Sequence, residues 1–326
     1  MRAREREVQR GAGGALAPRR PGEGGRAEPR RIPLTGRGPA DNLGGMKIAV
    51  SGKGGTGKTT LAGMLALYLA GQGRPVIAVD ADPAASLASA LGLRGEDAPA
   101  PISEMRELIL ERTGASEGYG SFFKLNPRVD DLPERFSATV RGVRLLVLGG
   151  VKSGGSGCIC PESALLRALV SHLILRQDET VIMDMEAGIE HLGRATARAV
   201  DRMIVMVEPG LRSVSTALAV RRLATEIGLV DVVAVANKVR PETDLGAIRA
   251  ALGDLELAGV IPYDQAIAEA DMRGESPYTG SPAQVAMMEA LAARILGPGR
   301  GGGGGGGGAG KDAGGGAAGT ARKASR

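Results

Sequence analysis

The sequence has very few aromatic residues and cysteines, and it has no long apolar run. Its 326 residues include no tryptophan, four tyrosines and three phenylalanines, so the core must be built from aliphatic side chains and methionine. Two cysteines in a chain of this length do not make a disulfide framework, and they suit a reducing cytosol. No apolar stretch approaches the roughly 18 residues that a membrane-spanning helix needs. With no signal peptide either, we expect a cytoplasmic protein without membrane contact.

Both ends of the chain lack the apolar patterning of a folded domain. Residues 1–45 are rich in Arg, Gly and Pro, and residues 298–326 contain eight consecutive glycines at 301–308. Neither segment can bury enough apolar surface to offset the entropy of ordering the chain, so we expect both to be disordered. Met46 directly precedes the first predicted strand and is a credible true start of translation. The predicted folded domain spans residues 46–297, a length that suits one α/β domain or two small ones.

The basic net charge of the chain comes from its two ends. Residues 1–45 contain ten arginines against five acidic residues, and residues 298–326 contain five basic residues against one aspartate. Since the whole chain is at +5, residues 46–297 are net acidic, at −4. We therefore do not expect the folded domain to bind nucleic acid or anionic lipid through a basic surface.

Short apolar runs alternate with helical patterns in the predicted domain. Because these runs are apolar and β-branched almost throughout, we expect strands that are buried on both faces of a sheet. The predicted strands are Lys47–Ser51, Val76–Asp80, Arg144–Leu148, Thr180–Asp184, Met203–Val207, Val232–Asn237 and Leu257–Ile261. The predicted helices are Lys58–Ala70, Ser103–Thr113, Glu162–Leu175, Ser213–Ile227, Leu245–Leu252 and Pro282–Leu296. This alternation predicts a single-domain α/β fold, with a mostly parallel twisted sheet and helices on both faces.

A glycine-rich loop follows the first predicted strand and leads directly into the first predicted helix. Its glycines allow backbone N–H groups to approach phosphate oxygens, and the helix N-terminus adds partial positive charge. The Lys58 side chain can reach the β- and γ-phosphates, and the Thr59 hydroxyl can ligate Mg²⁺. The pattern predicts a nucleotide-binding P-loop formed by Gly52, Lys53, Gly54, Gly55, Thr56, Gly57, Lys58, Thr59 and Thr60.

A second lysine inside the loop, Lys53, indicates which class of P-loop protein the chain resembles. The sequence K-G-G-T-G-K-T-T resembles the deviant Walker A motif of the MinD/ParA/nitrogenase-iron-protein class of P-loop ATPases. The resemblance implies ATP hydrolysis and a face-to-face homodimer in the ATP state. It also implies that Lys53 and Lys58 are catalytic, and that Lys53 reaches the phosphates bound by the partner subunit. The alternative is that Lys53 is a solvated lysine without a role.

Acidic residues at two strand ends fit the same class. Asp80 and Asp82 follow the second predicted strand, where carboxylates can order Mg²⁺ waters and an attacking water. Asp184 ends an apolar run, as in a Walker B strand. The resemblance implies that Asp82 is catalytic and orients the water, and that Asp80, Asp184 and Thr59 support Mg²⁺. Ordinary Asp-Pro turn chemistry is the alternative for Asp82.

Two further strand ends are expected to hold the base. Asn237 and Lys238 resemble the adenine-reading asparagine of this class and the residue after it, since an amide can both donate to and accept from the adenine edge. The segment Ile261-Pro262-Tyr263-Asp264 occupies the next strand end and is expected to form a wall beside the base, with Pro262 as the predicted contact residue. The N-K pair and the I-P-Y-D segment are both short motifs, and the P-loop in the same chain supports their interpretation.

The two cysteines stand together in the stretch G-G-S-G-C-I-C-P, as Cys158 and Cys160. Thiolates are soft ligands for zinc, nickel or copper(I). One pair supplies two sulfurs where a closed site usually needs four, and a two-fold dimer supplies four if the loop lies near the axis. We therefore expect a Ni²⁺ or Zn²⁺ site shared across a homodimer interface. Two buried structural thiols or a redox pair are the alternatives.

Together these motifs resemble the CooC-type ATPases, which help nickel to enter carbon monoxide dehydrogenase. The C-x-C pair and the dipeptide Glu190-His191 carry the subfamily likeness, which covers residues 46–297. The resemblance implies an ATP-dependent metallochaperone with ATP and Mg²⁺ as its cofactors. Its implied client is the catalytic subunit of a carbon monoxide dehydrogenase.

Two other functions within the same class are alternatives. A ParA- or MinD-like positioning ATPase would need a basic DNA-binding surface or a basic amphipathic C-terminal helix. The last predicted helix, Pro282–Leu296, contains only one arginine and one glutamate. A redox ATPase like the nitrogenase iron protein would draw cluster-ligating cysteines from two separated positions, not from a C-x-C pair. Neither alternative explains the paired cysteines, so the metallochaperone is the preferred prediction.

Overall fold

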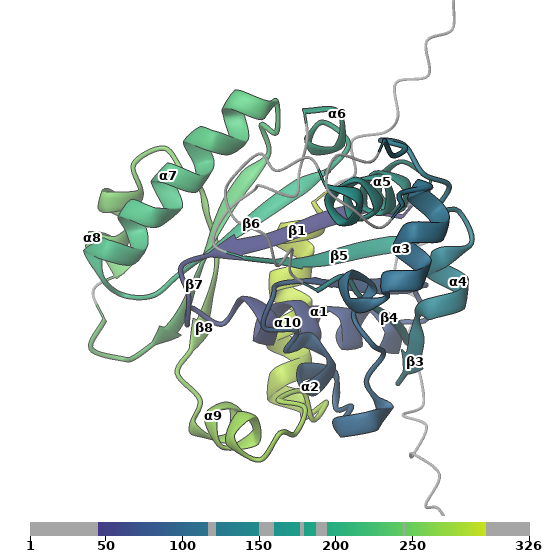
Figure 1. The fold of residues 1–326 in the computed structure, drawn as a ribbon. Helices are drawn as coiled ribbons and strands as arrows, with labels where there is room; N and C mark the ends of the chain where they lie inside the picture. The colour runs from purple at the N-terminus through teal and green to yellow at the C-terminus, as the bar shows by residue number, and fades with distance from the viewer. Residues whose placement is uncertain are drawn as a thin grey trace, which may run out of the picture. The chain divides into compact units, whose positions relative to one another are not determined.

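A central parallel sheet organises the fold (Figure 1). The computed structural model describes residues 45–116, 122–149, 160–176, 179–186, 194–243 and 245–297. Within these residues the sheet has eight strands in the order β3-β4-β2-β5-β1-β6-β7-β8. They are β1 (Lys47–Gly52), β2 (Val76–Ala81), β3 (Ala138–Val140), β4 (Val143–Val147), β5 (Thr180–Met185), β6 (Arg202–Val207), β7 (Val232–Val239) and β8 (Leu257–Pro262). Neighbouring strands are parallel, except that β3 runs antiparallel to β4.

Helices cover both faces of this sheet, as Figure 1 shows. The helices in the described residues are α1 (Lys58–Gly71), α2 (Leu87–Leu91), α3 (Arg106–Thr113), α4 (Leu132–Phe136), α5 (Pro161–Arg176), α6 (Arg194–Ala197), α7 (Leu211–Ile227), α8 (Leu245–Leu252), α9 (Gln265–Met272) and α10 (Pro282–Leu296). Two short 3₁₀ turns, Gly95–Asp97 and Ile102–Glu104, precede α3. The predicted fold class, a mostly parallel sheet with helices on both faces, is confirmed.

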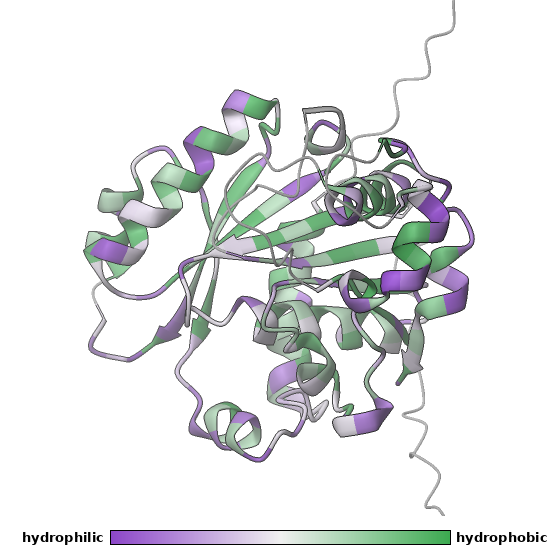
Figure 2. Ribbon diagram, in the orientation of Figure 1, coloured by the Kyte–Doolittle hydropathy of each residue, from purple (hydrophilic) through white to green (hydrophobic). Residues whose placement is uncertain are grey.

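Successive side chains along each strand pack into two separate hydrophobic cores, one on each face of the sheet. In β1, Ala49 belongs to the core under α3, α5, α7 and α8, whereas Ile48 and Val50 belong to the core under α1, α2 and α10. This follows from the two-residue period of a strand, which sends successive side chains to opposite faces. Figure 2 shows the strands as the continuous apolar centre of the domain. The helix α10 closes the second core with its buried residues Met288, Leu291 and Ile295.

The strand order brings the loops with the predicted site residues together at one edge of the sheet. The chain runs from β1 past β5 to β2, and later returns across β1 to reach β6. In an open parallel sheet, such a reversal of strand order leaves a crevice at the carboxyl ends of the strands, where ligands bind. The carboxyl ends of β1, β2, β5, β6, β7 and β8 all lie at this edge, so residues far apart in sequence meet there.

Several short elements were not predicted from the sequence. The strand β3 has only three residues and pairs with β4 through a tight hairpin. In that hairpin, Arg141 and Gly142 both adopt positive φ, at 48° and 84°. Such two-residue turns usually carry Asn-Gly or Asp-Gly, so the pair Arg-Gly is a weak signal. The predicted helix Ser103–Thr113 is also split into a 3₁₀ turn and α3.

No helix in the described part of the chain is both long and apolar enough to cross a membrane.

Candidate functional site

The phosphate-binding loop joins β1 to α1 at the centre of the sheet. The Thr56 hydroxyl donates to the Lys53 carbonyl at 2.7 Å, and the Thr56 N–H donates to the same carbonyl at 3.3 Å. These bonds close the loop into a tight turn around the fully buried Thr56. Lys58 is 7% exposed, whereas Lys53, Gly54 and Gly55 are exposed to solvent. The two lysines of the motif therefore lie in opposite environments.

Two glycines of the loop are required by sterics. Gly57 has φ +89°, and a Cβ on it would lie 2.2 Å from Nδ2 of Asn237. Gly52 has φ +144°, and a Cβ there would lie 2.6 Å from the Met206 carbonyl oxygen in β6. No side chain of the described residues caps the N-terminus of α1, which begins directly after Gly57. The loop therefore presents the unpaired first-turn N–H groups of a long helix, an arrangement that suits an anion.

Two buried aspartates lie beside the loop. Burial raises the pKa of Asp184 to about 7 and that of Asp80 to about 6, although two backbone N–H groups, those of Leu87 and Asp82, donate to the Asp80 carboxylate. Neither Asp184 oxygen has a hydrogen-bond partner among the described residues. The Thr59 hydroxyl and the Lys58 ammonium lie near enough to lower the pKa of Asp184, but the hydroxyl does not meet hydrogen-bond geometry.

This group of oxygens fits a magnesium ion. A buried carboxylate without a hydrogen-bond partner is costly unless a cation or donor compensates it. Mg²⁺ prefers oxygen ligands and keeps several of its waters, which suits a site built from the Thr59 hydroxyl and the carboxylates Asp80 and Asp184. When bound, Mg²⁺ would neutralise charge on the β- and γ-phosphates of ATP. The predicted magnesium residues are thus brought together, and their individual roles stay predictions.

Asp82 lies at the same edge but makes a local bond. Its side chain is half-buried, and Oδ1 accepts from the Ala84 N–H at 2.9 Å. Its charge also raises the pKa of both Asp80 and Asp184, so it lies close to them. The Asx-type bond fits the Asp-Pro turn alternative, while the position fits the orientation of a water. The catalytic role of Asp82 stays a prediction.

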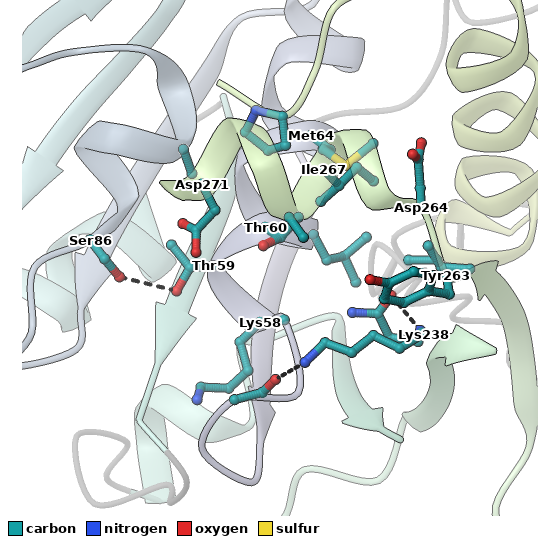
Figure 3. Close-up of a pocket in the computed structure, with 18 of the residues that line it drawn as sticks. Lys58, Thr59, Thr60, Met64, Ser86, Lys238, Tyr263, Asp264, Ile267 and Asp271 are labelled. Carbon is teal, nitrogen blue, oxygen red and sulfur yellow. Dashed lines mark hydrogen bonds between the residues drawn. The ribbon is translucent and has the colours of Figure 1, made fainter. Parts of the chain in front are cut away.

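A pocket of about 610 Å³ opens beside the P-loop. Figure 3 shows Lys58, Thr59 and Thr60 on one side of it, with Tyr263 and Lys238 on the other. The predicted nucleotide residues that line it are Gly55, Gly57, Lys58, Thr59, Thr60, Asn237, Lys238 and Pro262. Gly52, Lys53, Gly54 and Thr56 shape the loop without lining the pocket. The site thus joins the P-loop to the ends of β7 and β8.

Asn237 lines the pocket, but most of its side chain is buried against the P-loop. Its Nδ2 donates to the Thr56 carbonyl at 2.9 Å, and its Oδ1 accepts from the Lys238 N–H at 2.9 Å. One N–H and one lone pair of the amide stay available for a base. Adenine reading by Asn237 therefore stays a prediction, next to a structural contact that the sequence did not indicate.

Several residues of this pocket have no clear signal in the sequence. The helix α9 contributes Ile267 and Asp271, and its N-cap residue Asp264 also lines the pocket. No motif in the sequence marks that helix. Tyr263 also lines the pocket, with the Arg240 guanidinium 4.2 Å from its ring centroid. Tyr263 and Asp264 belong to the I-P-Y-D segment that is expected to lie beside the base, and that role stays a prediction.

Only part of the predicted cysteine site lies in the described residues. Cys160 directly precedes α5, and its Sγ accepts from the Ser163 N–H at 3.4 Å. Cys158, Glu190 and His191 lie outside the residues that the structure describes. Among the described residues, no three His, Cys, Asp or Glu side chains are grouped so that they could hold a metal ion.

The fold and the loop define the class: this is a P-loop ATPase of the α/β type. Comparison with known proteins agrees. Residues 47–278 match the CobQ/CobB/MinD/ParA nucleotide binding domain family, and the chain belongs to that family. It is similar in structure to MinD of Pyrococcus horikoshii in complex with Mg-ADP, with a TM-score of 0.56 and 22% identity. That match covers 77% of this chain and 95% of the other, and at this identity it supports the fold alone.

Sequence relatives place the chain more finely within the family. It is 49% identical over 262 residues to the carbon monoxide dehydrogenase accessory protein CooC of Rhodospirillum rubrum. This match covers 78% of this chain and 99% of CooC. The chain is also 44% identical over 234 residues to an uncharacterized ATP-binding protein of Methanocaldococcus jannaschii, covering 71% and 90% of the two chains. The resemblance to the CooC type is thereby confirmed.

Proposed function

We propose that this ATPase assists the insertion of nickel into a carbon monoxide dehydrogenase. The observation that carries the proposal is the 49% identity to CooC over 99% of that accessory protein. A P-loop ATPase can couple hydrolysis to a conformational change, because loops held by the γ-phosphate are released when it is cleaved, and such a change can act on another protein. The nucleotide cycle therefore serves a client, which we propose to be the catalytic subunit.

ATP is proposed to close two copies of the chain face to face. Lys53 is exposed on the loop while Lys58 is buried beneath it. An exposed lysine at the rim of a phosphate site can reach the phosphates of a facing subunit, and a buried one can serve only its own. This difference supports the assignment of Lys53 to the partner's nucleotide and of Lys58 to its own.

The metal is proposed to bind between the two copies. Cys160 is held by the first turn of α5, so its sulfur has a defined position at the start of a long helix. Cys158 lies two residues earlier in the chain. Two copies together supply four thiolates, which is the usual number for a closed site of Ni²⁺ or Zn²⁺. Nickel is the cargo in this proposal, and zinc is an alternative occupant of the same thiolates.

Metal stoichiometry tests the shared site. Nickel or zinc titration, followed by thiolate charge-transfer absorption and by sedimentation, should show one ion per dimer and a shift from monomer to dimer. Ligation requires thiolate, so binding should release protons and weaken at low pH. Cys158→Ser should remove both signals and leave ATP binding unchanged. One tightly bound ion per monomer, without a change in oligomeric state, would exclude the shared site.

Client activation tests the function itself. A nickel-free carbon monoxide dehydrogenase, produced together with the ATPase at limiting nickel, should gain activity. Co-production with Lys53→Ala or Cys158→Ser should leave the enzyme inactive, and excess nickel should bypass the requirement. Equal activation by the unchanged chain and by both variants would contradict the proposal.

A further inference from the structure

A series of polar contacts connects the P-loop to the ends of β6 and β7. The Lys238 ammonium donates to the Gly55 carbonyl at 2.7 Å and pairs with the Glu208 carboxylate at 2.6 Å. The Glu208 N–H in turn donates to the buried Ser213 hydroxyl at 2.9 Å, in the first turn of α7. We infer that Glu208 and Lys238 are positioning residues, which hold the P-loop in the conformation that accepts phosphate. The inference deepens the proposed function, and it rests on its ATP-binding part only.

The backbone at Lys238 is shaped for this contact. Lys238 has φ +57°, one of three non-glycine residues with positive φ in the described chain. The register between β7 and β8 also shifts between Ala236 and Val239. A residue with a Cβ persists in the left-handed region only where its surroundings impose it. The local geometry turns Lys238 out of the sheet ladder, and Figure 3 shows its side chain extending across to the loop.

A second contact from the same strand holds the next peptide of the loop. Asn237 binds the Thr56 carbonyl, and Lys238 binds the Gly55 carbonyl. In a trans peptide the carbonyl and the following N–H point in opposite directions, so the position of a carbonyl also sets the next N–H. No peptide bond in the described residues is cis. The two hydrogen bonds from β7 to consecutive loop carbonyls thus orient the N–H groups of Thr56 and Gly57. Because Asn237 binds the Thr56 carbonyl, the N–H of Gly57 faces away from Asn237.

The role of Glu208 is to keep Lys238 on the loop. Lys238 would otherwise be a mobile cation at the rim of a phosphate site, free to contact the nucleotide directly. The side chains of Lys238 and Glu208 are 48% and 35% exposed. An ion pair this exposed contributes little to global stability. Its loss should therefore change nucleotide affinity far more than it changes folding.

The two roles of Lys238 predict opposite effects of Glu208→Gln. If Lys238 is a positioning residue, removal of the Glu208 charge loosens the loop, and Mg-ADP binds several-fold more weakly. If Lys238 is a direct ligand of the nucleotide, the same change frees its charge, and binding stays equal or becomes tighter. Lys238→Met removes the donor while keeping the apolar stem, and should weaken Mg-ADP binding roughly tenfold, as expected for one hydrogen bond to a charged group.

Titration calorimetry with Mg-ADP and Mg-ATP, together with melting of the nucleotide-free full chain, tests the inference. Both variants should raise KM for ATP more than they lower kcat, melt as the unchanged chain does, and show non-additive losses when combined. Lys238→Arg should restore most of the affinity. Asp254→Asn is the matched control, since it breaks an exposed ion pair with Arg221 that does not line the pocket, and it should bind normally.

Wild-type affinity in Lys238→Met would overturn the inference, and so would an unchanged or tighter affinity in Glu208→Gln. A loss of affinity in Glu208→Gln that Asp254→Asn matches would overturn it as well. Failure of the unchanged chain to bind Mg-ADP would instead contradict the ATPase assignment. The outcome of the nickel experiments does not bear on this inference.

Discussion

At the residue scale, two lysines of one loop are expected to have separable roles. Lys58 is buried beneath the phosphate site, so Lys58→Ala should weaken ATP binding on the order of 10- to 100-fold, the effect of one charge-assisted hydrogen bond. Lys53 is exposed, so Lys53→Ala should bind ATP within about threefold of the unchanged chain. It should nevertheless lose hydrolysis and ATP-dependent dimerisation, because its target lies in the other subunit. Titration calorimetry and light scattering measure both effects, and normal hydrolysis by Lys53→Ala would exclude the cross-subunit role.

The buried carboxylate of Asp184 is expected to make the nucleotide-free protein sensitive to pH. Burial, the largest cause, raises the pKa of Asp184 from 3.8 to about 7, and nearby Asp80 adds to the rise. The folded chain therefore holds a proton that the unfolded chain releases near pH 4. This stability is fully present below about pH 4 and is lost as pH rises through about 7.

Asp184→Asn should flatten that dependence. Melting between pH 5 and 8 should show a falling stability for the unchanged chain and a smaller fall for the variant. The difference at pH 8 should be on the order of 1–3 kcal/mol in favour of the variant. Glu226→Gln is the control, because it removes an exposed carboxylate in α7 that is not among the groups that shift the pKa of Asp184. Parallel pH profiles for the unchanged chain and Asp184→Asn would show that Asp184 does not carry the effect.

At the element scale, Cys160 has a structural contact that is separate from metal binding. Its sulfur accepts from the Ser163 N–H at the start of α5. Cys160→Ala should remove this cap and cost about 1 kcal/mol in the free energy of unfolding, whereas Cys160→Ser should keep it, since serine is a good capping residue. Both variants should lose the metal. Thermal melts and metal titration measure the two effects, and equal stability of the two variants would show that the cap contributes nothing.

Long apolar strands could be located from sequence, and short irregular elements could not. The predicted strand at Val76–Asp80 differs from β2 by one residue, because a strand buried on both faces is apolar along its whole length. The hairpin strand β3 and the helix α9 are short and partly exposed, so their patterns are weak. One side of the pocket is formed by α9, so its residues have no clear signal in the sequence.

At the scale of the whole molecule, the ATPase is expected to reside in residues 46–297. The helix α10 closes a core with Met288, Leu291 and Ile295, and Gly297 follows it. A chain trimmed to residues 46–297 should retain ATP hydrolysis and melt within about 2 °C of the full chain, since small changes in stability shift Tm by only a few degrees. Differential scanning calorimetry measures this, and a loss of several degrees would show that an end segment packs on the domain.

The phosphate end of the site could be predicted from the sequence by itself, together with the class of the protein. A P-loop is a strand, a turn and a helix in contiguous residues, so its geometry depends on local glycines, Lys58 and Thr59. The base end and the ties to the loop were decided by the tertiary structure. Asn237 and Lys238 reach the P-loop carbonyls, and Glu208 reaches Lys238, only because β6 and β7 follow β1 in the sheet. Strand order is set by how the whole core packs, and no local spacing in the sequence encodes it.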